Sequence, residues 1–139
     1  MTKTKLIYKK ALIVDDNNLS RRMIQYYLEA LNCDWTEAQD GLQTIDLLKQ
    51  KSFDLIILDW HMPQLNGYQT LITGDKILAE KNHRGQTPVL IYTSVELKEL
   101  QIPHCNRLSV RATLSKRLSP ALQQRKLSQA IEALLFHRG

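Results

Sequence analysis

The feature that most constrains the fold of this chain is an alternation of short apolar runs with segments of helical periodicity. Three runs, at residues 11–14, 55–58 and 89–92, are almost continuously apolar and rich in β-branched side chains. Such runs are typical of parallel strands that are covered on both faces. Weaker strand patterns lie at residues 34–37 and 111–114. Strands that alternate with helices predict an α/β fold around a parallel sheet, with right-handed crossovers and helices on both faces.

The helical segments between these runs carry apolar side chains at the spacing of one helix face. Five of them follow the five strand patterns in turn, which predicts five β-α repeats. The predicted helices are residues 20–31 with Ser20 as the N-cap, 41–50, about 67–82, a short one at 95–102, and a last helix that opens at Ser119 and Pro120.

Length and composition are those of one globular domain. A chain of 139 residues holds one sizeable core but not two ordinary domains, so we expect a single domain over 1–139 with its core at about 10–136. Apolar residues make up 43% and charged residues 24%, which excludes a disordered chain. No apolar run reaches the roughly 18 residues that cross a bilayer, and the start carries no export signal. We therefore expect a cytoplasmic domain without membrane contact.

The net charge of +5 is concentrated toward the C-terminal end of the chain. Residues 101–139 hold seven lysines or arginines and a single acid, Glu132. A basic surface of this kind can attract nucleic acid or an acidic partner. No aromatic side chains are interleaved with the basic ones for base stacking, so we expect a solvated face and no direct contact with nucleic acid.

Polar residues directly follow four of the five strand patterns. In open parallel sheets the ligand crevice lies at the carboxyl ends of the strands, so these residues are expected to converge. Carboxylates packed together repel one another unless a cation lies among them, and oxygen ligands suit Mg2+. The set predicts phosphoryl chemistry, with one carboxylate as nucleophile and the ammonium and a hydroxyl neutralising charge. Its members are Asp15, Asp16, Asp59, Thr93 and Lys116, with Asp59 best placed for attack.

Four motifs resemble those of response-regulator receiver domains in two-component signalling. The segments LIVDDN at 12–17 and DWHMPQLNG at 59–67 are similar to the acidic pair and the Asp-x-x-Met-Pro-x-x-x-Gly signature of that family. The segments PVLIYTS at 88–94 and LSK at 114–116 resemble its fourth and fifth strand ends. The likeness covers about residues 10–135. It implies a flavodoxin-like doubly wound (βα)5 fold with strand order 2-1-3-4-5, in a chemotaxis-type regulator or the receiver of a hybrid histidine kinase.

The resemblance also implies a metal site. Asp59 would be the phosphoacceptor, and Asp16 and Asp59 would bind Mg2+ directly. Asp15 would contribute mainly through water, and the backbone carbonyl of His61 would also face the metal. The imidazole of His61 is expected to be exposed and without a role.

The same resemblance implies how the phosphoryl group arrives and what it does. Thr93 would hydrogen-bond a phosphoryl oxygen, and Lys116 would pair with Asp59 or its phosphate. The donor would be a histidine kinase or histidine phosphotransfer domain, and the output an unidentified protein that binds the last two helices and the fifth strand. The domain would assist its own phosphorylation and dephosphorylation without being an enzyme that acts on other molecules.

Two positions depart from the family pattern. Arg117 stands where the family usually has a proline with a cis peptide bond, and a non-proline cis bond costs about 2.5–4 kcal/mol, so a trans peptide is predicted. Thr113 replaces the usual aromatic switch. Tyr92 cannot simply take over that role, because neighbouring strand residues such as Tyr92 and Thr93 point to opposite faces. The way in which phosphorylation would act on the output face therefore has two alternatives. The domain switches by small movements of loops and helices, or its contacts with the partner are largely constitutive.

Two other functions are open alternatives. The first is an aspartyl phosphohydrolase similar to haloacid dehalogenases, but such enzymes need a second Asp two residues after the nucleophile, and that position holds His61. The chain also has no cap segment to enclose a substrate. The second is a receiver-like interaction module that works without phosphorylation, which the departures at Thr113 and Arg117 keep open.

Overall fold

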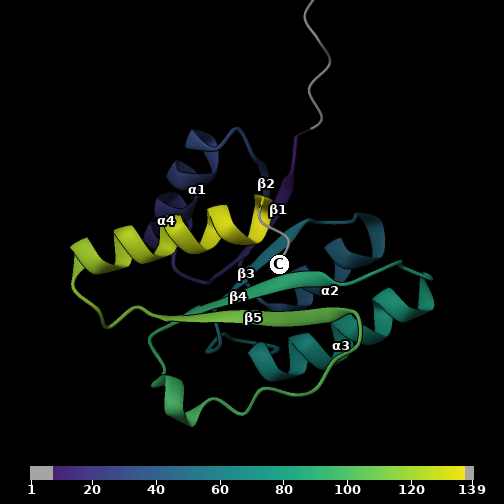
Figure 1. Ribbon diagram of the computed structural model, residues 1–139. Helices are drawn as coiled ribbons and strands as arrows, with labels where there is room; N and C mark the ends of the chain where they lie inside the picture. The colour runs from purple at the N-terminus through teal and green to yellow at the C-terminus, as the bar shows by residue number, and fades with distance from the viewer. Residues whose placement is uncertain (1–7, 137–139) are drawn as a thin grey trace, which may run out of the picture.

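A single parallel sheet of five strands forms the centre of the computed structural model, which describes residues 8–136. The strand order is β2-β1-β3-β4-β5, and each neighbouring pair is parallel (Figure 1). This confirms the predicted flavodoxin-like order. The strands are β1 (Lys10–Val14), β2 (Asp34–Ala38), β3 (Leu55–Leu58), β4 (Thr87–Thr93) and β5 (Leu108–Ser115).

Helices cover both faces of the sheet, as the continuous apolar strands require. One core cluster joins β1 and β3 to α1 and α4, and a second joins the other side of the same strands to α2 and α3. Figure 1 shows α1 and α4 together on one side of the sheet, with α3 on the other. The helices are α1 (Asn18–Ala30), α2 (Gly41–Gln50), α3 (Gly67–Glu80) and α4 (Pro120–Phe136).

The side chains of strand β1 pack into both core clusters. Successive side chains of a strand point to opposite faces, so Ala11 and Ile13 pack in the cluster with α1 and α4, whereas Leu12 and Val14 pack in the cluster with α2 and α3. All four side chains are fully buried. Burying a side chain of this size stabilises the fold by about 1.5–3 kcal/mol, which fixes the strand and the position of the residues that follow it.

The predicted helix at residues 95–102 is wrong. The structure has only a short 3-10 helix there, η1 (Leu97–Glu99), and the rest of the connection to β5 is irregular. Pro103 accounts only for the end of the segment, because a proline disfavours the α conformation at the residue before it. Within the segment, the N–H groups of Glu99 and Leu100 donate to carbonyl oxygens three residues earlier, which is the 3-10 pattern. Residues 8–136 therefore form four α-helices where five were predicted.

The end of this connection is held by a carboxylate of α3. Oδ1 and Oδ2 of Asp75 accept hydrogen bonds from the backbone N–H groups of Asn106, Arg107 and Leu108. Buried or half-buried backbone donors need such partners when no helix provides them. Asp75 thus anchors the segment that leads into β5, which lies just beyond the predicted helix.

The N-cap of α1 also differs from the prediction. Asn17, and not Ser20, is the N-cap, and its side chain accepts a hydrogen bond from the backbone N–H of Ser20. Ser20 is the third residue of the helix. The helix therefore begins at Asn18, two residues before its predicted start, and its N-cap directly follows the Asp15-Asp16 pair.

Candidate functional site

Three acidic side chains meet at the carboxyl ends of β1 and β3. Ligand oxygens of Asp15, Asp16 and Asp59 all lie within 4.8 Å of one another. Asp15 is 1% exposed and Asp59 is 6% exposed, whereas Asp16 is open to solvent. Two largely buried carboxylates beside an exposed one form a cup with one open side, as the sequence predicted for the strand ends.

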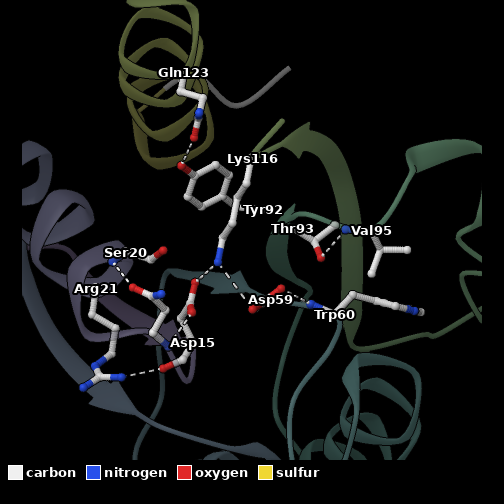
Figure 2. Close-up of polar contacts among 11 residues, drawn as sticks. Asp15, Ser20, Arg21, Asp59, Trp60, Tyr92, Thr93, Val95, Lys116 and Gln123 are labelled. Carbon is white, nitrogen blue, oxygen red and sulfur yellow. Dashed lines mark hydrogen bonds and ion pairs between the residues drawn. The ribbon is translucent and has the colours of Figure 1, made fainter. Parts of the chain in front are cut away.

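Lys116 reaches this cup from the end of β5 (Figure 2). Its Nζ lies 2.7 Å from Oδ2 of Asp15 and 3.4 Å from Oδ2 of Asp59. Its backbone N–H donates to the carbonyl oxygen of Thr93 at 2.8 Å, which fixes the residue beside the end of β4. The single ammonium therefore bridges two carboxylates and balances only part of the local negative charge.

Burial raises the pKa of Asp15 above its ordinary value of 3.8. The hydrogen bonds from Lys116 and from the backbone N–H of Asn17 act in the opposite direction without outweighing burial. These bonds also occupy both oxygens, since Oδ1 accepts from Asn17 at 2.9 Å and Oδ2 accepts from Lys116. A divalent cation at the cup would stabilise the ionised form of Asp15.

Asp59 is placed by the strand ahead of it and by the loop behind it. Its backbone N–H donates to the carbonyl oxygen of Val14 at 2.8 Å, so it lies beside the end of β1. Its Oδ1 accepts from the backbone N–H of Trp60 at 2.8 Å. Its Oδ2 has only the longer contact with Lys116, so this oxygen is the less constrained of the two.

The loop after Asp59 closes tightly on Trp60. The backbone N–H of Gly67 donates to the carbonyl oxygen of Trp60 at 2.8 Å. A Cβ atom at position 67 would lie 2.4 Å from Cε3 of the Trp60 ring, so only glycine fits here without displacement. The glycine of the signature therefore allows α3 to begin directly against the residue that follows Asp59.

The other predicted site residues take separate positions. Thr93 is fully buried, and its Oγ1 accepts from the backbone N–H of Val95 at 3.3 Å. In Figure 2 its side chain points away from the ring of Tyr92, as expected for neighbours in a strand. The side chain of His61 is exposed and does not belong to the acidic group. Thr93 thus lies buried at the end of β4, where its carbonyl oxygen accepts from Lys116, while the imidazole of His61 lies outside the acidic group.

The two departures from the receiver pattern also have clear positions. No cis peptide bond occurs within residues 8–136, which confirms the predicted trans peptide before Arg117. The Nε of Arg117 donates to the carbonyl oxygen of Ser94 at 2.6 Å, and Nη1 lies 3.2 Å from Oε1 of Glu96. Thr113 is exposed on β5. Arg117 therefore ties together the loops that follow β4 and β5.

The sequence analysis did not identify Arg21, which binds the backbone of Asp15 in the acidic cup. Arg21 is largely buried; its Nη1 donates to the backbone carbonyl of Asp15 at 2.7 Å and its Nε pairs with Glu37 at 3.0 Å. Its position could have been found, because it shares a helix face with the buried Ile24 and Leu28. A charged residue on an apolar stripe needs charged or hydrogen-bonding partners, which here are Glu37 and the carbonyl of Asp15.

Sequence reasoning also missed what the Tyr92 side chain contacts. The ring is buried, Nζ of Lys116 lies 5.3 Å from its centroid, and its hydroxyl donates to Oε1 of Gln123 in α4. Burial, followed by the charges of Asp15 and Asp59, raises the pKa of Tyr92 to about 12, so the hydroxyl keeps its proton.

Comparisons with known proteins point to one family. Residues 11–132 match the family model of the response regulator receiver domain. The chain is 33% identical over 126 residues to chemotaxis protein CheY-3 of Vibrio cholerae, covering 90% of this chain and 93% of that protein. It is 31% identical over 132 residues to the Regulator of RpoS of Escherichia coli, covering 94% of this chain but 36% of that protein.

A solved structure extends the likeness to three dimensions. The receiver domain of a sensor histidine kinase from Pseudomonas aeruginosa, with a magnesium ion coordinated in its active site cleft, shares 26% sequence identity with this chain. The TM-score is 0.66, and the match covers 88% of this chain and 97% of that one. Within residues 8–136 no helix is long and apolar enough to span a membrane.

Proposed function

This chain belongs to the response regulator receiver domain family of two-component signalling, and we propose that it accepts a phosphoryl group on Asp59. The observation that carries the proposal is the meeting of Asp59 with Asp15, Asp16 and Lys116 at one edge of the sheet. The donor would be a histidine kinase or a histidine phosphotransfer protein. The phosphorylated domain would signal through an output protein.

The proposed transfer is an in-line displacement at phosphorus. A carboxylate oxygen of Asp59 attacks the phosphorus of a phosphohistidine, the phosphorus–nitrogen bond breaks, and the imidazole leaves with that electron pair. The product is an acyl phosphate on Asp59. Attack by water on this group later releases phosphate and restores the carboxylate. Oδ2 is the better placed oxygen because Oδ1 is engaged by the backbone of Trp60.

Mg2+ is the cation that we propose for the acidic cup. Bound there, it would supply positive charge that neutralises the phosphoryl oxygens during transfer. The donor set fits, because it consists of carboxylate oxygens, one of them solvent-exposed on Asp16. Asp16 and Asp59 would bind directly, together with the backbone carbonyl of His61. Asp15 would act mainly through water, which agrees with the hydrogen bonds that already occupy both its oxygens.

Lys116 and Thr93 would stabilise the transferred group. The ammonium of Lys116 already contacts Asp59 and can follow a phosphoryl oxygen that is added there. The hydroxyl of Thr93 accepts a hydrogen bond from Val95 and keeps its own proton free for donation. Adding a charge of roughly −1.5 to −2 at Asp59 would draw both groups toward it. The loops after β4 and β5 would move with them.

The output partner would contact β5, α4 and the connection that contains η1. This is the face that phosphorylation would reach through Thr93 and Lys116, and it includes the basic end of the chain. We propose that the chain forms a single cytoplasmic domain, which assists its own phosphorylation and dephosphorylation. Direct contact with nucleic acid is not part of the proposal.

A second function is favoured by the Arg117 contacts. Arg117 holds the loops after β4 and β5 together through Ser94 and Glu96, and a domain locked in this way could present one surface at all times. It would then act as an interaction module without phosphorylation. The phosphohydrolase alternative gains no such support, because His61 stands at the position of the second Asp and its side chain is exposed.

Incubation with acetyl phosphate and Mg2+ tests the proposal directly. Intact mass spectrometry should show the addition of one phosphoryl group, and the fluorescence of Trp60 should change because its backbone contacts the acceptor. The matched control is Asp59→Asn, which keeps the size of the side chain but removes the nucleophile. A phosphoryl adduct that persists in this variant would refute Asp59 as the acceptor. Absence of any adduct in the parent protein would favour the interaction module.

A further inference from the structure

Tyr92 joins the acceptor site to helix α4. The residue lies on β4 directly before Thr93, but its side chain enters the core between the sheet and the pair of helices α1 and α4. Figure 2 shows its ring between Lys116 on one side and Gln123 on the other. A residue in this place touches both the ammonium of the acceptor site and a helix of the proposed output face.

The hydroxyl of Tyr92 is bound to α4 by a defined hydrogen bond. It donates to Oε1 of Gln123, and Nε2 of Gln123 donates to the carbonyl oxygen of Leu118 at 2.6 Å. Both ends of the Gln123 amide are therefore used, which fixes its orientation. A buried hydroxyl in a low-dielectric core needs such a partner, so Tyr92 and the start of α4 cannot move independently without loss of this bond.

The aromatic ring of Tyr92 contacts the ammonium of Lys116. Nζ of Lys116 lies 5.3 Å from the ring centroid while it also contacts Asp15 and Asp59. A largely buried ammonium at this distance from an aromatic face is attracted by it. The position of the ammonium is thus set by two carboxylates and one aromatic ring.

The side chain at position 113 does not provide another connection between the acceptor site and α4. Thr113 is small and exposed on the edge strand β5. It has no buried aromatic ring that could turn inward when the acceptor site changes. The side chains that connect the site to α4 are instead Lys116, Tyr92 and Gln123.

We infer that Tyr92 is a positioning residue for Lys116 and that it transmits the charge state of Asp59 to α4 through Gln123. The inference rests on the proposed phosphorylation of Asp59. A phosphoryl group there would draw the ammonium away from Asp15, shift it relative to the ring, and alter the bond between Tyr92 and Gln123. Helix α4 would respond at its first turns.

The test compares amide NMR shifts of the full chain with and without beryllium fluoride and Mg2+, which together mimic the phosphoryl group. Tyr92→Phe removes only the hydroxyl, and Gln123→Met removes only the amide. In both variants the response of Trp60 should match that of the parent, while the shift changes in α4 should fall by about half or more. Tyr27→Phe is the matched control, since it removes the hydroxyl of another tyrosine in the same core cluster and should leave the α4 response intact.

A second measurement isolates the ring. Tyr92→Leu should slow phosphorylation by acetyl phosphate about two- to fivefold, because it removes the attraction that holds Lys116. Tyr92→Phe keeps the ring and should restore the parent rate, a rescue that a purely structural role for the hydroxyl would not produce.

The results of these experiments distinguish a failure of the inference about Tyr92 from a failure of the proposed phosphorylation of Asp59. Undiminished α4 shifts in both Tyr92→Phe and Gln123→Met, beside a normal response of Trp60, would overturn the inference alone. A parent protein whose Trp60 amide does not respond at all would overturn the proposed phosphorylation and the inference with it.

Discussion

Lys116 Nζ lies 2.7 Å from Oδ2 of Asp15, although 101 positions of sequence separate the two residues. The contact crosses the sheet from the end of β5 to the end of β1. Because the distance to Asp59 is longer, at 3.4 Å, the ammonium is held mainly by the carboxylate that is not the proposed acceptor. Asp15 thereby controls how readily Lys116 can turn toward a phosphoryl group.

Replacing Asp15 by Asn should stabilise the protein near neutral pH in the absence of metal. Burial raises the pKa of Asp15, so the folded state favours its protonated form, and the ionised form is disfavoured there. This penalty is absent below the ordinary pKa of 3.8 and develops as the pH rises through the raised value in the folded state. Urea unfolding should therefore show a gain near neutral pH that vanishes below pH 3.8.

The exposed Asp16 supplies the control for this substitution. Asp16→Asn should leave the metal-free stability almost unchanged at either pH, because an exposed carboxylate is well solvated in both states. A gain in Asp15→Asn that is equal at the two pH values would contradict the assigned cause.

Mg2+ should raise the melting temperature of the protein, and chelation with EDTA should reverse the effect. A ligand that binds only the folded state adds about 2.7 kcal/mol of stability at a hundredfold excess over its dissociation constant. Asp16→Asn should remove most of this gain because Asp16 is a proposed direct ligand. Asp15→Asn should remove less, since both oxygens of Asp15 already accept hydrogen bonds. Equal melting curves with and without Mg2+ would argue against the metal site.

Gly67→Ala should lower the free energy of unfolding by about 1–3 kcal/mol, the usual range for a side chain forced into a packed site. The added methyl would lie 2.4 Å from Cε3 of Trp60. The emission spectrum of Trp60 should shift as the ring is displaced. Lys76→Ala, at an exposed position of α3, is the control and should change neither property. An unshifted spectrum together with parent stability would show that the loop relaxes freely.

Asp75→Ala should destabilise the protein by roughly 2–3 kcal/mol, because it leaves backbone donors of the segment before β5 without their charged acceptor. Amide hydrogen exchange at residues 106–108 should become faster. Asp75→Asn retains one acceptor oxygen and should fall between the parent and the alanine variant. Unchanged exchange at these amides in both variants would show that Asp75 does not hold the segment.

The sheet and the acidic cup were predictable because each depends on local sequence. Runs such as residues 55–58 are apolar at every position, short and rich in β-branched side chains, which favours a strand covered on both faces. The acids were found because they directly follow such runs, and parallel strands end at one edge of the sheet. The strand order, which came from the resemblance to receiver domains, brings the ends of β1, β3 and β5 to this edge, and the side-chain contacts of Lys116 with Asp15 and Asp59 complete the group.

The connection before β5 and the supports of the site were not predictable in the same way. Residues 95–102 carry helical spacing, but the backbone donors just beyond them, at residues 106–108, bond to Asp75, which lies more than thirty positions away. The bond between Tyr92 and Gln123 likewise depends on how α4 lies over the sheet. Contacts between distant segments override local propensity here, and no local pattern reveals them.

The irregular connection that carries η1 changes what a binding protein would meet at this edge. A helix presents a ridge of side chains every three or four residues, whereas a bent strap offers them singly and in no regular line. The last amides of this connection, at residues 106–108, are anchored to Asp75, so a helix that extended over them would break those bonds. A protein that contacts this rim would therefore meet an irregular backbone segment with a fixed end, and not the regular face of a helix.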